Sequence, residues 1–372
     1  MADTQAQTET AVAARQRKTL PGAVIQSLVR GGVFFSWFLP SFSNIGYRLR
    51  SPLFRATAFD FSGQHWLVTG ASAGIGREIA RQAALGGATV LAAARNQPLL
   101  DQLAEEVAAA VEPGPAAGRV VPLAADLSEV SVADRALSAA ALPLPPGIRL
   151  DVLVNNVGVM RDQPEVTAEG LDLVLATNLV VPYQLTGKLL AGGRLDASST
   201  VITMSSGGMY NVPLNLSALL PGKRYNGTLA YAFQKRAQVA LNRHWQVAPE
   251  YPFASYVMHP GWVDTPGVRS SMPEFYQLMK PILRGLTAGA DTALWLAATK
   301  PARDRTGGIW LDRKRRPEHL LPGTRGGASG PELIEFLEQQ IAQAQRGTEP
   351  VAGSDSADRA QGATTDAKAP AG

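Results

Sequence analysis

The stretch Gln64–Gly76 reads Gln-His-Trp-Leu-Val-Thr-Gly-Ala-Ser-Ala-Gly-Ile-Gly, and it decides the fold. Its apolar first half, 64–69, is typical of a buried strand, and the apolar spacing that follows predicts a helix over 75–86. A glycine-rich turn between a strand and a helix can bind an anion, because free N–H groups at the helix N-terminus point at the anion and the helix dipole favours its charge. The stretch therefore predicts a phosphate site.

The glycines of this turn have separate roles. Gly70 allows the tight turn, Gly74 lets the backbone approach a pyrophosphate, and Gly76 lets the helix pack closely on the strand. The same residues also match the Gly-x-Ser-x-Gly nucleophile elbow of hydrolases. No oxyanion-hole segment precedes them and no histidine lies in a suitable later loop. Ser72 is therefore interpreted as a hydroxyl of a phosphate loop.

Strand and helix patterns alternate along the middle of the chain, which predicts an α/β fold of the Rossmann type with a doubly wound parallel sheet of about seven strands. A single domain is expected over residues 61–345. The expected strands are 64–69, 88–93, 119–124, 151–155, 199–204, 254–259 and 308–311. The expected helices are 75–86, 97–111, 129–141, 168–191, 228–247 and 286–299.

Composition excludes some kinds of site and gives no support to others. The 372 residues include no cysteine, so disulfides and thiolate metal sites are excluded, and the four histidines lack ligand spacing, so no metal is expected. The net charge of +4 gives no reason to expect nucleic acid as a partner.

The ends differ from the middle. Residues 1–60 form an expected N-terminal extension with a disordered polar start, and residues 346–372 an expected disordered tail. The apolar, aromatic segment 23–40 is short for a membrane span, and no signal-peptide cleavage site follows it. It is interpreted either as a helix packed on the outside of the domain or as a contact with a membrane interface near Arg48, Arg50 and Arg55. The expected location is the cytoplasm, with the peripheral membrane contact left open.

The strand ends carry the residues that would choose a cofactor. After the second strand, Ala94 stands where an acid would bind the ribose of NAD, and Arg95 follows it. A guanidinium can pair with the 2′-phosphate of NADP, which favours NADP over NAD; the alternative is a solvated arginine at a helix start. Asp126, ahead of Leu127, is interpreted as an acceptor for the adenine amino group or as a cap of the next helix.

Two further strand ends complete this edge of the sheet. At the fourth strand, the side-chain amides of Asn155 and Asn156 can tie neighbouring strand ends together and Gly158 leaves room beside a cofactor, unless the segment is only a turn. The fifth strand ends at Ser205-Ser206, where a hydroxyl can bond a substrate oxygen.

A tyrosine and a lysine supply the proton chemistry. Tyr231 and Lys235 lie four residues apart and so share a helix face. A neighbouring ammonium favours the phenolate and draws its pKa down from about 10. The pair Tyr276/Lys280 has the same spacing, but it follows the sixth strand and has no strand-end serine before it, so Tyr231 is preferred.

Taken in order, these motifs resemble those of the short-chain dehydrogenase/reductase family over about residues 60–312. The motifs are Thr69–Gly76, Asn155–Gly158, Ser206, Tyr231 with Lys235, and His259–Thr265. Finer features resemble a branch of that family with an N-terminal extension; they are Met204–Met209, His259–Val268, Asp312–Lys314 and His319-Leu320.

The resemblance implies a role for each matched residue. Tyr231 would be the general acid in reduction and the base in oxidation, and Lys235 would bind the nicotinamide ribose and lower the Tyr231 pKa. Ser206 would polarise the carbonyl, and Asn178 would hold a water that links Lys235 to solvent. The implied cofactor is NADP(H), held by Gly70, Ser72, Gly74, Ile75, Gly76, Arg95, Asp126, Leu127, Asn155, Gly158, Tyr231, Lys235, Pro260, Val263 and Thr265.

Some positions depart from the family pattern. Val157 stands where alanine is usual, and position 73 lacks the basic residue of many NADP-using members, so Arg95 alone carries the cofactor prediction. The long gap between Ser206 and Tyr231 resembles that of retinol-dehydrogenase-like members, in which the insertion shapes the pocket.

That insertion, Met209–Leu216, is interpreted either as ordinary loop packing or as part of an apolar mouth with Met272, Phe275, Tyr276, Leu278 and Met279. A mouth of this kind predicts a lipophilic carbonyl or alcohol substrate. The alternative function is a non-catalytic cofactor-binding protein that acts through a partner or a membrane. A homo-oligomer is left open.

Overall fold

The computed structural model describes residues 34–347 except 115–116, 223, 303–306 and 322. The expectations for the polar start, for residues 23–33 and for the tail beyond Gly347 lie outside the described residues.

One sheet organises the described chain, with the strand order β3-β2-β1-β4-β5-β6-β7-β8. Its strands are β1 (His65–Thr69), β2 (Thr89–Ala94), β3 (Arg119–Ala124), β4 (Val152–Asn155), β5 (Thr200–Met204), β6 (Ala254–Met258), β7 (Ile309–Leu311) and β8 (Lys314–Arg316). The first seven are parallel, so the doubly wound α/β fold is confirmed. The order reverses between β1 and β4, which is where ligands bind in such sheets.

The eighth strand is an addition that the sequence did not predict. β8 pairs antiparallel with β7 through a two-residue turn, Asp312 and Arg313, with φ values of 52° and 55°. Positive φ at both turn residues is the geometry that suits a tight hairpin. The strand itself is Lys-Arg-Arg, so no apolar alternation could mark it.

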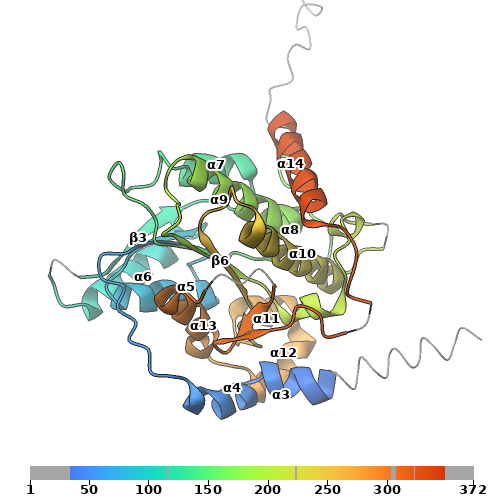
Figure 1. Ribbon diagram of the computed structural model, residues 1–372, viewed down its shortest axis with the longest axis horizontal. Coiled ribbons are helices and arrows are strands. Elements are labelled where there is room, and N and C mark those ends of the chain that lie inside the picture. The colour runs from blue at the N-terminus through green and yellow to red at the C-terminus, as the bar shows by residue number, and fades with distance from the viewer. Residues whose placement is uncertain (1–33, 115–116, 223, 303–306, 322, 348–372) are drawn as a thin grey trace, which may run out of the picture.

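Helices cover both faces of the sheet (Figure 1). One face carries α5 (Gly74–Leu85), α6 (Gln97–Ala110) and α13 (Leu286–Thr299). The other carries α7 (Val130–Leu137), α9 (Val181–Ala191), α10 (Gly227–Val247) and α14 (Gly330–Gly347). The smaller helices are α3 (Leu39–Phe42), α4 (Asn44–Arg50), α8 (Leu173–Leu175), α11 (Pro266–Ser271) and α12 (Pro273–Met279).

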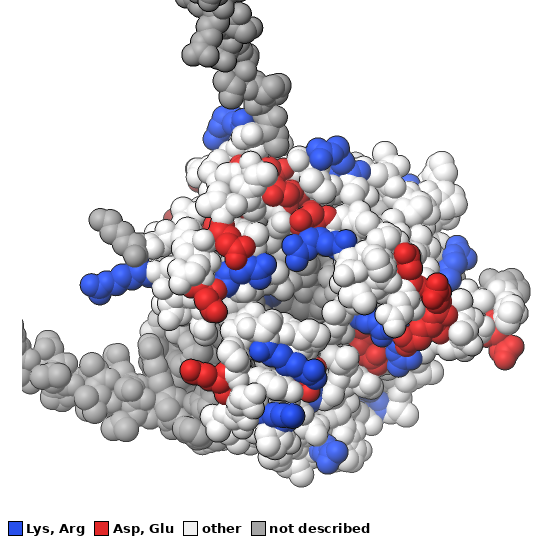
Figure 2. Space-filling model, turned by 180° about the vertical axis from the view of Figure 1, so that it is seen from behind, with Lys and Arg blue, Asp and Glu red and all other residues white. Residues whose placement is uncertain are grey.

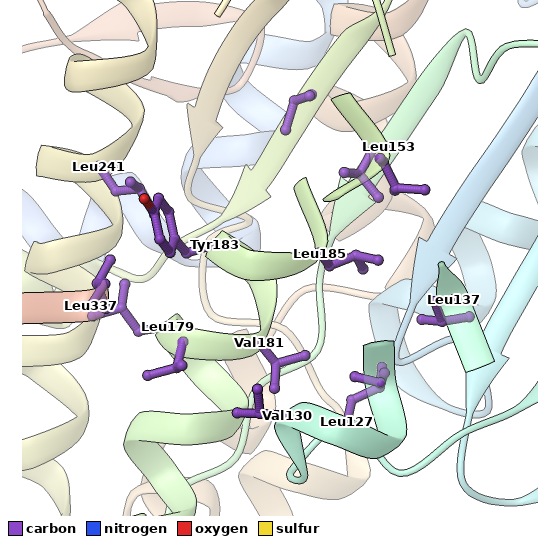
Figure 3. Close-up of a cluster of buried hydrophobic side chains, with 14 of the residues drawn as sticks. Leu127, Val130, Leu137, Leu153, Leu179, Val181, Tyr183, Leu185, Leu241 and Leu337 are labelled. Carbon is purple, nitrogen blue, oxygen red and sulfur yellow. The ribbon is translucent and has the colours of Figure 1, made fainter. Parts of the chain in front are cut away.

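The two apolar layers follow from strand alternation. Trp66 and Val68 face one layer and Leu67 faces the other, as successive side chains of a strand must. Figure 3 shows the second layer, where Leu337 of α14 joins the cluster that holds Leu241 and Tyr183. α14 was not predicted, although its leucines recur every four residues and bury one helix face.

The most apolar long helix belongs to this core. Leu173–Ala191 is long and apolar enough to span a membrane, but 78% of its most apolar window is buried against the rest of the protein. The helix includes a π-helical segment, Ala176–Val180, which contains Asn178. Such segments are frequent at functional sites.

The N-terminal extension packs more deeply than an outer surface helix. Phe38 and Phe42 are 4% and 2% exposed, and they join a cluster with Met209 and Tyr210. In Figure 1, α3 and α4 lie along the side of the domain that also carries α12. Figure 2 shows the molecule from behind the view of Figure 1; on that face, Lys and Arg side chains are interspersed with Asp and Glu.

Candidate active site

The glycine-rich turn between β1 and α5 has the predicted shape. Gly70 and Gly74 have φ values of +68° and +60°, a region that glycine adopts without strain. A Cβ on Gly76 would lie 2.4 Å from the Gly70 carbonyl oxygen and 2.2 Å from Asn156 Nδ2. Side chains at these glycines would fill the turn, so their absence leaves a cradle of backbone groups at the start of α5. Ser72 and Ile75 belong to the same turn.

Asn156 fixes this turn, and it was not among the predicted site residues. Its Nδ2 donates to the Thr69 carbonyl at 2.8 Å and to the Gly70 carbonyl at 3.3 Å. The Thr69 hydroxyl in turn donates to the Val154 carbonyl at 3.1 Å and accepts from the Asn156 N–H. These bonds lock the ends of β1 and β4 together, which is the role expected of the amides that follow the fourth strand.

Asn155 itself faces inward. Its side chain is 2% exposed, and its Nδ2 donates to the Thr186 hydroxyl at 3.2 Å. Leu127, another predicted cofactor residue, also buries its side chain in the core (Figure 3). Only the backbone of either residue is placed to meet a cofactor.

Arg95 and Asp126 mark the far end of the site, at the ends of β2 and β3. Arg95 Nη1 lies 4.0 Å from Asp126 Oδ2, with side chains 60% and 40% exposed. The other carboxylate oxygen of Asp126 accepts from the N–H and the hydroxyl of Ser128 at 2.9 and 2.7 Å. Asp126 thus closes a local turn and still presents one oxygen toward Arg95.

Gly158, Asn178 and Lys235 meet on the other side of the turn. A Cβ on Gly158 would lie 3.4 Å from Lys235 Nζ and 3.5 Å from Asn178 Oδ1. The Asn178 amide is held by the backbone of Val159, accepting at 2.8 Å and donating at 2.8 Å. Lys235 Nζ donates to the Met204 carbonyl at 2.8 Å. The absent side chain of Gly158 therefore leaves polar groups facing one space.

Tyr231 stands beside this space with Ser206. The Ser206 hydroxyl lies near the phenol, and Lys235 Nζ lies 5.3 Å from the centre of the Tyr231 ring. Burial raises the pKa of the Tyr231 phenol to about 12, and the nearby Ser206 hydroxyl only partly opposes this. Burial also lowers the pKa of the Lys235 ammonium to about 7. The protein groups alone therefore keep the phenol protonated at neutral pH.

The segment after β6 closes the site. Thr265 caps α11 by accepting from the Val268 N–H at 3.2 Å, and its methyl carbon lies 3.5 Å from the Cβ position of Gly74. Val263 is 2% exposed and, with Ile75, packs against Gly289. Pro260 begins this segment directly after the buried His259. Thr265 and Val263 thus lie beside the start of α5, next to the glycine-rich turn.

Comparison with known proteins identifies this arrangement. A family model described as short chain dehydrogenase matches residues 64–272. The chain belongs to the short-chain dehydrogenase/reductase family. It is 35% identical to human "Dehydrogenase/reductase SDR family member 12" over 84% of this chain and 98% of that protein. This protein belongs to the branch of the family that the finer sequence features resemble.

Other members of the family are more distant. Human retinol dehydrogenase 12 is 28% identical over 70% of this chain and 81% of its own length. The Pseudomonas aeruginosa RhlG/NADP active-site complex superposes with a TM-score of 0.53 at 25% identity, covering 68% of this chain and 96% of that one. As a short-chain dehydrogenase/reductase, this protein is an NAD(P)-dependent oxidoreductase.

The residues present fit such a dinucleotide. The cradle at Gly70–Gly76 suits a pyrophosphate, and the space beside Gly158 faces a lysine and an amide. Bound NAD(P)H supplies the hydride in this family. The chain then has to hold a carbonyl oxygen and move a proton to it, and the neighbouring Ser206 hydroxyl and Tyr231 phenol are available for these two tasks.

The insertion after Ser206 does not form a mouth. Met209, Tyr210, Val212 and Leu214 are 0–6% exposed, and the Tyr210 hydroxyl donates to the Pro317 carbonyl at 3.0 Å. These side chains are core, so the interpretation as ordinary packing is the correct one. Of the other mouth candidates, Met279 is buried, Leu278 is 74% exposed, and Phe275 packs edge-on against Trp262.

The buried Lys235 makes stability depend on pH. Its pKa falls from an ordinary 10.5 to about 7 on folding, so between these values the unfolded chain binds a proton that the folded chain lacks. The free energy of unfolding should therefore rise with pH across this window. We expect the free energy of unfolding of the parent, minus that of Lys235→Met, to rise from about pH 7 to about pH 9.5 in urea titrations. A difference that stays constant would contradict the assignment.

Proposed function

We propose that this protein is an NADP(H)-dependent oxidoreductase that transfers a hydride between the nicotinamide and a carbonyl or alcohol carbon. One observation carries the proposal: the Ser206 hydroxyl, just after β5, lies near the Tyr231 phenol of α10, and Lys235 Nζ is 5.3 Å from the phenol ring. The second Tyr-x3-Lys pair has no such surroundings. Tyr276 lies on α12, where Arg269 stacks over its ring at 5.5 Å.

The choice of NADP(H) rests on Arg95. Its guanidinium is largely exposed and 4.0 Å from a single carboxylate oxygen, so little holds it away from a 2′-phosphate. Ala94, at the end of β2, offers no carboxylate that would repel the phosphate. Asp126 fits best as an acceptor at the adenosine end.

The substrate we propose is lipophilic. The support is the aromatic pair Trp262–Phe275, whose ring centroids lie 5.3 Å apart, together with the exposed Leu278 on the same helix as Phe275. The similarity to proteins named retinol dehydrogenase agrees with this class. The buried insertion after Ser206 contributes no surface to such a substrate.

The test is a screen of aliphatic and aromatic aldehydes and ketones in which NADPH absorbance reports turnover. We expect reduction of at least one lipophilic carbonyl, and loss of that turnover in Tyr231→Phe. NADPH binding without turnover of any compound, in the presence of correctly folded protein, would instead favour the non-catalytic cofactor-binding alternative.

We further propose a cytoplasmic protein that docks on an anionic membrane surface. The support is a row of exposed apolar residues on α4 and the turn after it: Ile45, Leu49 and Leu53 are 49%, 72% and 82% exposed. They recur every four residues, as on one side of a helix, and the exposed Arg48 and Arg55 lie beside them.

Vesicle flotation tests this docking. Leu49→Glu with Leu53→Glu should reduce association with anionic vesicles by at least about thirtyfold, because burial of each leucine contributes about 1–2 kcal/mol, or about 2–4 kcal/mol for the pair. Leu99→Glu, at an exposed leucine of α6, is the matched control. Equal flotation of all three proteins would remove the membrane proposal, and loss of a dimer in the double variant would assign the row to self-association.

A further inference from the structure

The N-terminal segment Phe38–Arg50, called the clamp below, is bonded to the loop Pro260–Thr265. The Phe42 carbonyl accepts from the Trp262 N–H at 2.8 Å. On its other side, the Trp262 carbonyl accepts from the Arg284 N–H at 2.8 Å, and the Arg284 carbonyl accepts from the Asp264 N–H at 2.9 Å. The loop backbone is thus held between the clamp and the segment at Arg284.

A buried charge network fastens the clamp to this segment. Arg284 and Asp312 have side chains 1% exposed and are paired by bonds of 2.6 and 3.1 Å. Arg284 also donates to the carbonyls of Ser41 at 2.8 Å, Ser43 at 3.2 Å and Pro260 at 3.2 Å. A buried guanidinium needs all of these acceptors, so it ties the clamp and the start of the loop to one point.

Arg50 completes the network from the clamp itself. Its Nε and Nη2 both donate to Asp312 Oδ2, at 2.8 and 2.5 Å, and Nη2 also reaches the Ser41 carbonyl. Asp312 therefore bridges two arginines from a position in the tight turn between β7 and β8. Charge-assisted pairs of this kind are the strongest hydrogen bonds in proteins.

Phe42 links the clamp to both loops of the candidate site. Its ring lies edge-on to His259 at 4.3 Å and to Trp262 at 5.8 Å. A Cβ on Gly207, the residue after Ser206, would lie 2.7 Å from Phe42 Cε2 and 3.0 Å from His259 Nε2. Burial and the nearby Arg284 lower the pKa of His259 to about 3, so the imidazole is neutral and packs as a flat ring.

We propose that the clamp positions the nicotinamide half of the cofactor site. Phe42 packs against the two loops that carry Ser206 and Pro260, and Arg284 bonds the clamp to the loop Pro260–Thr265. The inference rests on the proposed function. The adenosine half is built from other parts of the chain, namely the turn at Gly70–Gly76 and the ends of β2 and β3. A defect in the clamp should therefore affect one half of the dinucleotide and spare the other.

The experiment compares two ligands in the full-length protein. NADPH reports both halves of the site, whereas adenosine 2′,5′-bisphosphate reports the adenosine half alone. In Phe42→Leu we expect the Kd of NADPH to rise about tenfold, equivalent to about 1.4 kcal/mol. The Kd of the bisphosphate should change less than about twofold, and kcat should fall more than the KM of the carbonyl substrate changes.

A matched control separates positioning from general stability. Phe253 is also fully buried, but it lies in the core on the opposite side of the sheet from α5. Phe253→Leu should lower the melting temperature comparably and leave the ratio of the two dissociation constants unchanged. Arg50→Lys is a second clamp variant; it keeps the charge but loses the two-point geometry, and it should reproduce the selective loss if Phe42→Leu does not fold.

The outcomes are distinct. If the clamp variants bind both ligands equally more weakly, or bind both as tightly as the parent does, the inference is overturned. NADPH-dependent turnover by the parent would in that case leave the proposed function intact. A parent that bound neither ligand would instead refute the proposed function and this inference together.

Discussion

Replacing Tyr231 with phenylalanine should lower kcat by about 10²–10⁴-fold, the usual contribution of a positioned proton donor. The change removes only the phenol oxygen, which is the group that lies near the Ser206 hydroxyl. The ring that lies 5.3 Å from Lys235 Nζ is kept, so the surroundings of the lysine should be preserved. NADPH should bind the variant about as tightly as the parent.

The second tyrosine motif supplies the control. Tyr276→Phe on α12 should reduce turnover only mildly, because that phenol lies beside Arg269. Turnover near that of the parent in Tyr231→Phe would remove Tyr231 from the mechanism. A larger loss at Tyr276 than at Tyr231 would mean that the other copy supplies the proton.

The double change Ala94→Asp with Arg95→Leu should invert the cofactor preference. A charged hydrogen bond to the 2′-phosphate contributes roughly 1.5–3 kcal/mol, or about ten- to a hundredfold in affinity. The variant loses this bond and gains a carboxylate that repels the phosphate and accepts from the ribose hydroxyl of NADH. The measurement is the Kd of NADPH and of NADH for both proteins.

Arg119→Leu is the matched control for charge. Arg119 is also exposed, but it starts β3, at the opposite end of the sheet from the candidate site. It should leave both dissociation constants unchanged. A parent that already bound NADH as tightly as NADPH would show that Arg95 does not select the cofactor, and the family assignment would stand.

The fold was predictable because its signals are local. Each parallel strand is an apolar run of a few residues, and the glycine-rich turn follows directly on the first of them. The motifs of the candidate site are also short segments at strand ends. A parallel sheet brings such ends to one edge, so the sequence could place Gly158, Ser206 and Tyr231 near one another before any coordinate was known.

What the sequence did not predict depends on distant partners. β8 is a run of basic residues that forms a strand only because β7 lies beside it. The insertion Met209–Leu216 has the composition of either a mouth or a core, and only the packing of Phe38 and Phe42 against it decides for the core. Arg284 gave no local signal, because its acceptors lie at Ser41, Ser43 and Asp312.

The pairing of Arg50 with Asp312 has a consequence for how the protein is made. These residues are 262 positions apart, so the ribosome releases the clamp well before its partner. Until the β7–β8 turn emerges, Phe38 and Phe42 lack part of the cluster they complete, and a nascent chain with exposed aromatic residues is prone to aggregation. The hydrogen bonds that fix the glycine-rich turn, by contrast, come from partners that all precede residue 158. A chain that stops before the β7–β8 turn could thus assemble the site for one end of the dinucleotide without the other, and tight binding of the whole cofactor would mark a chain synthesised past Asp312.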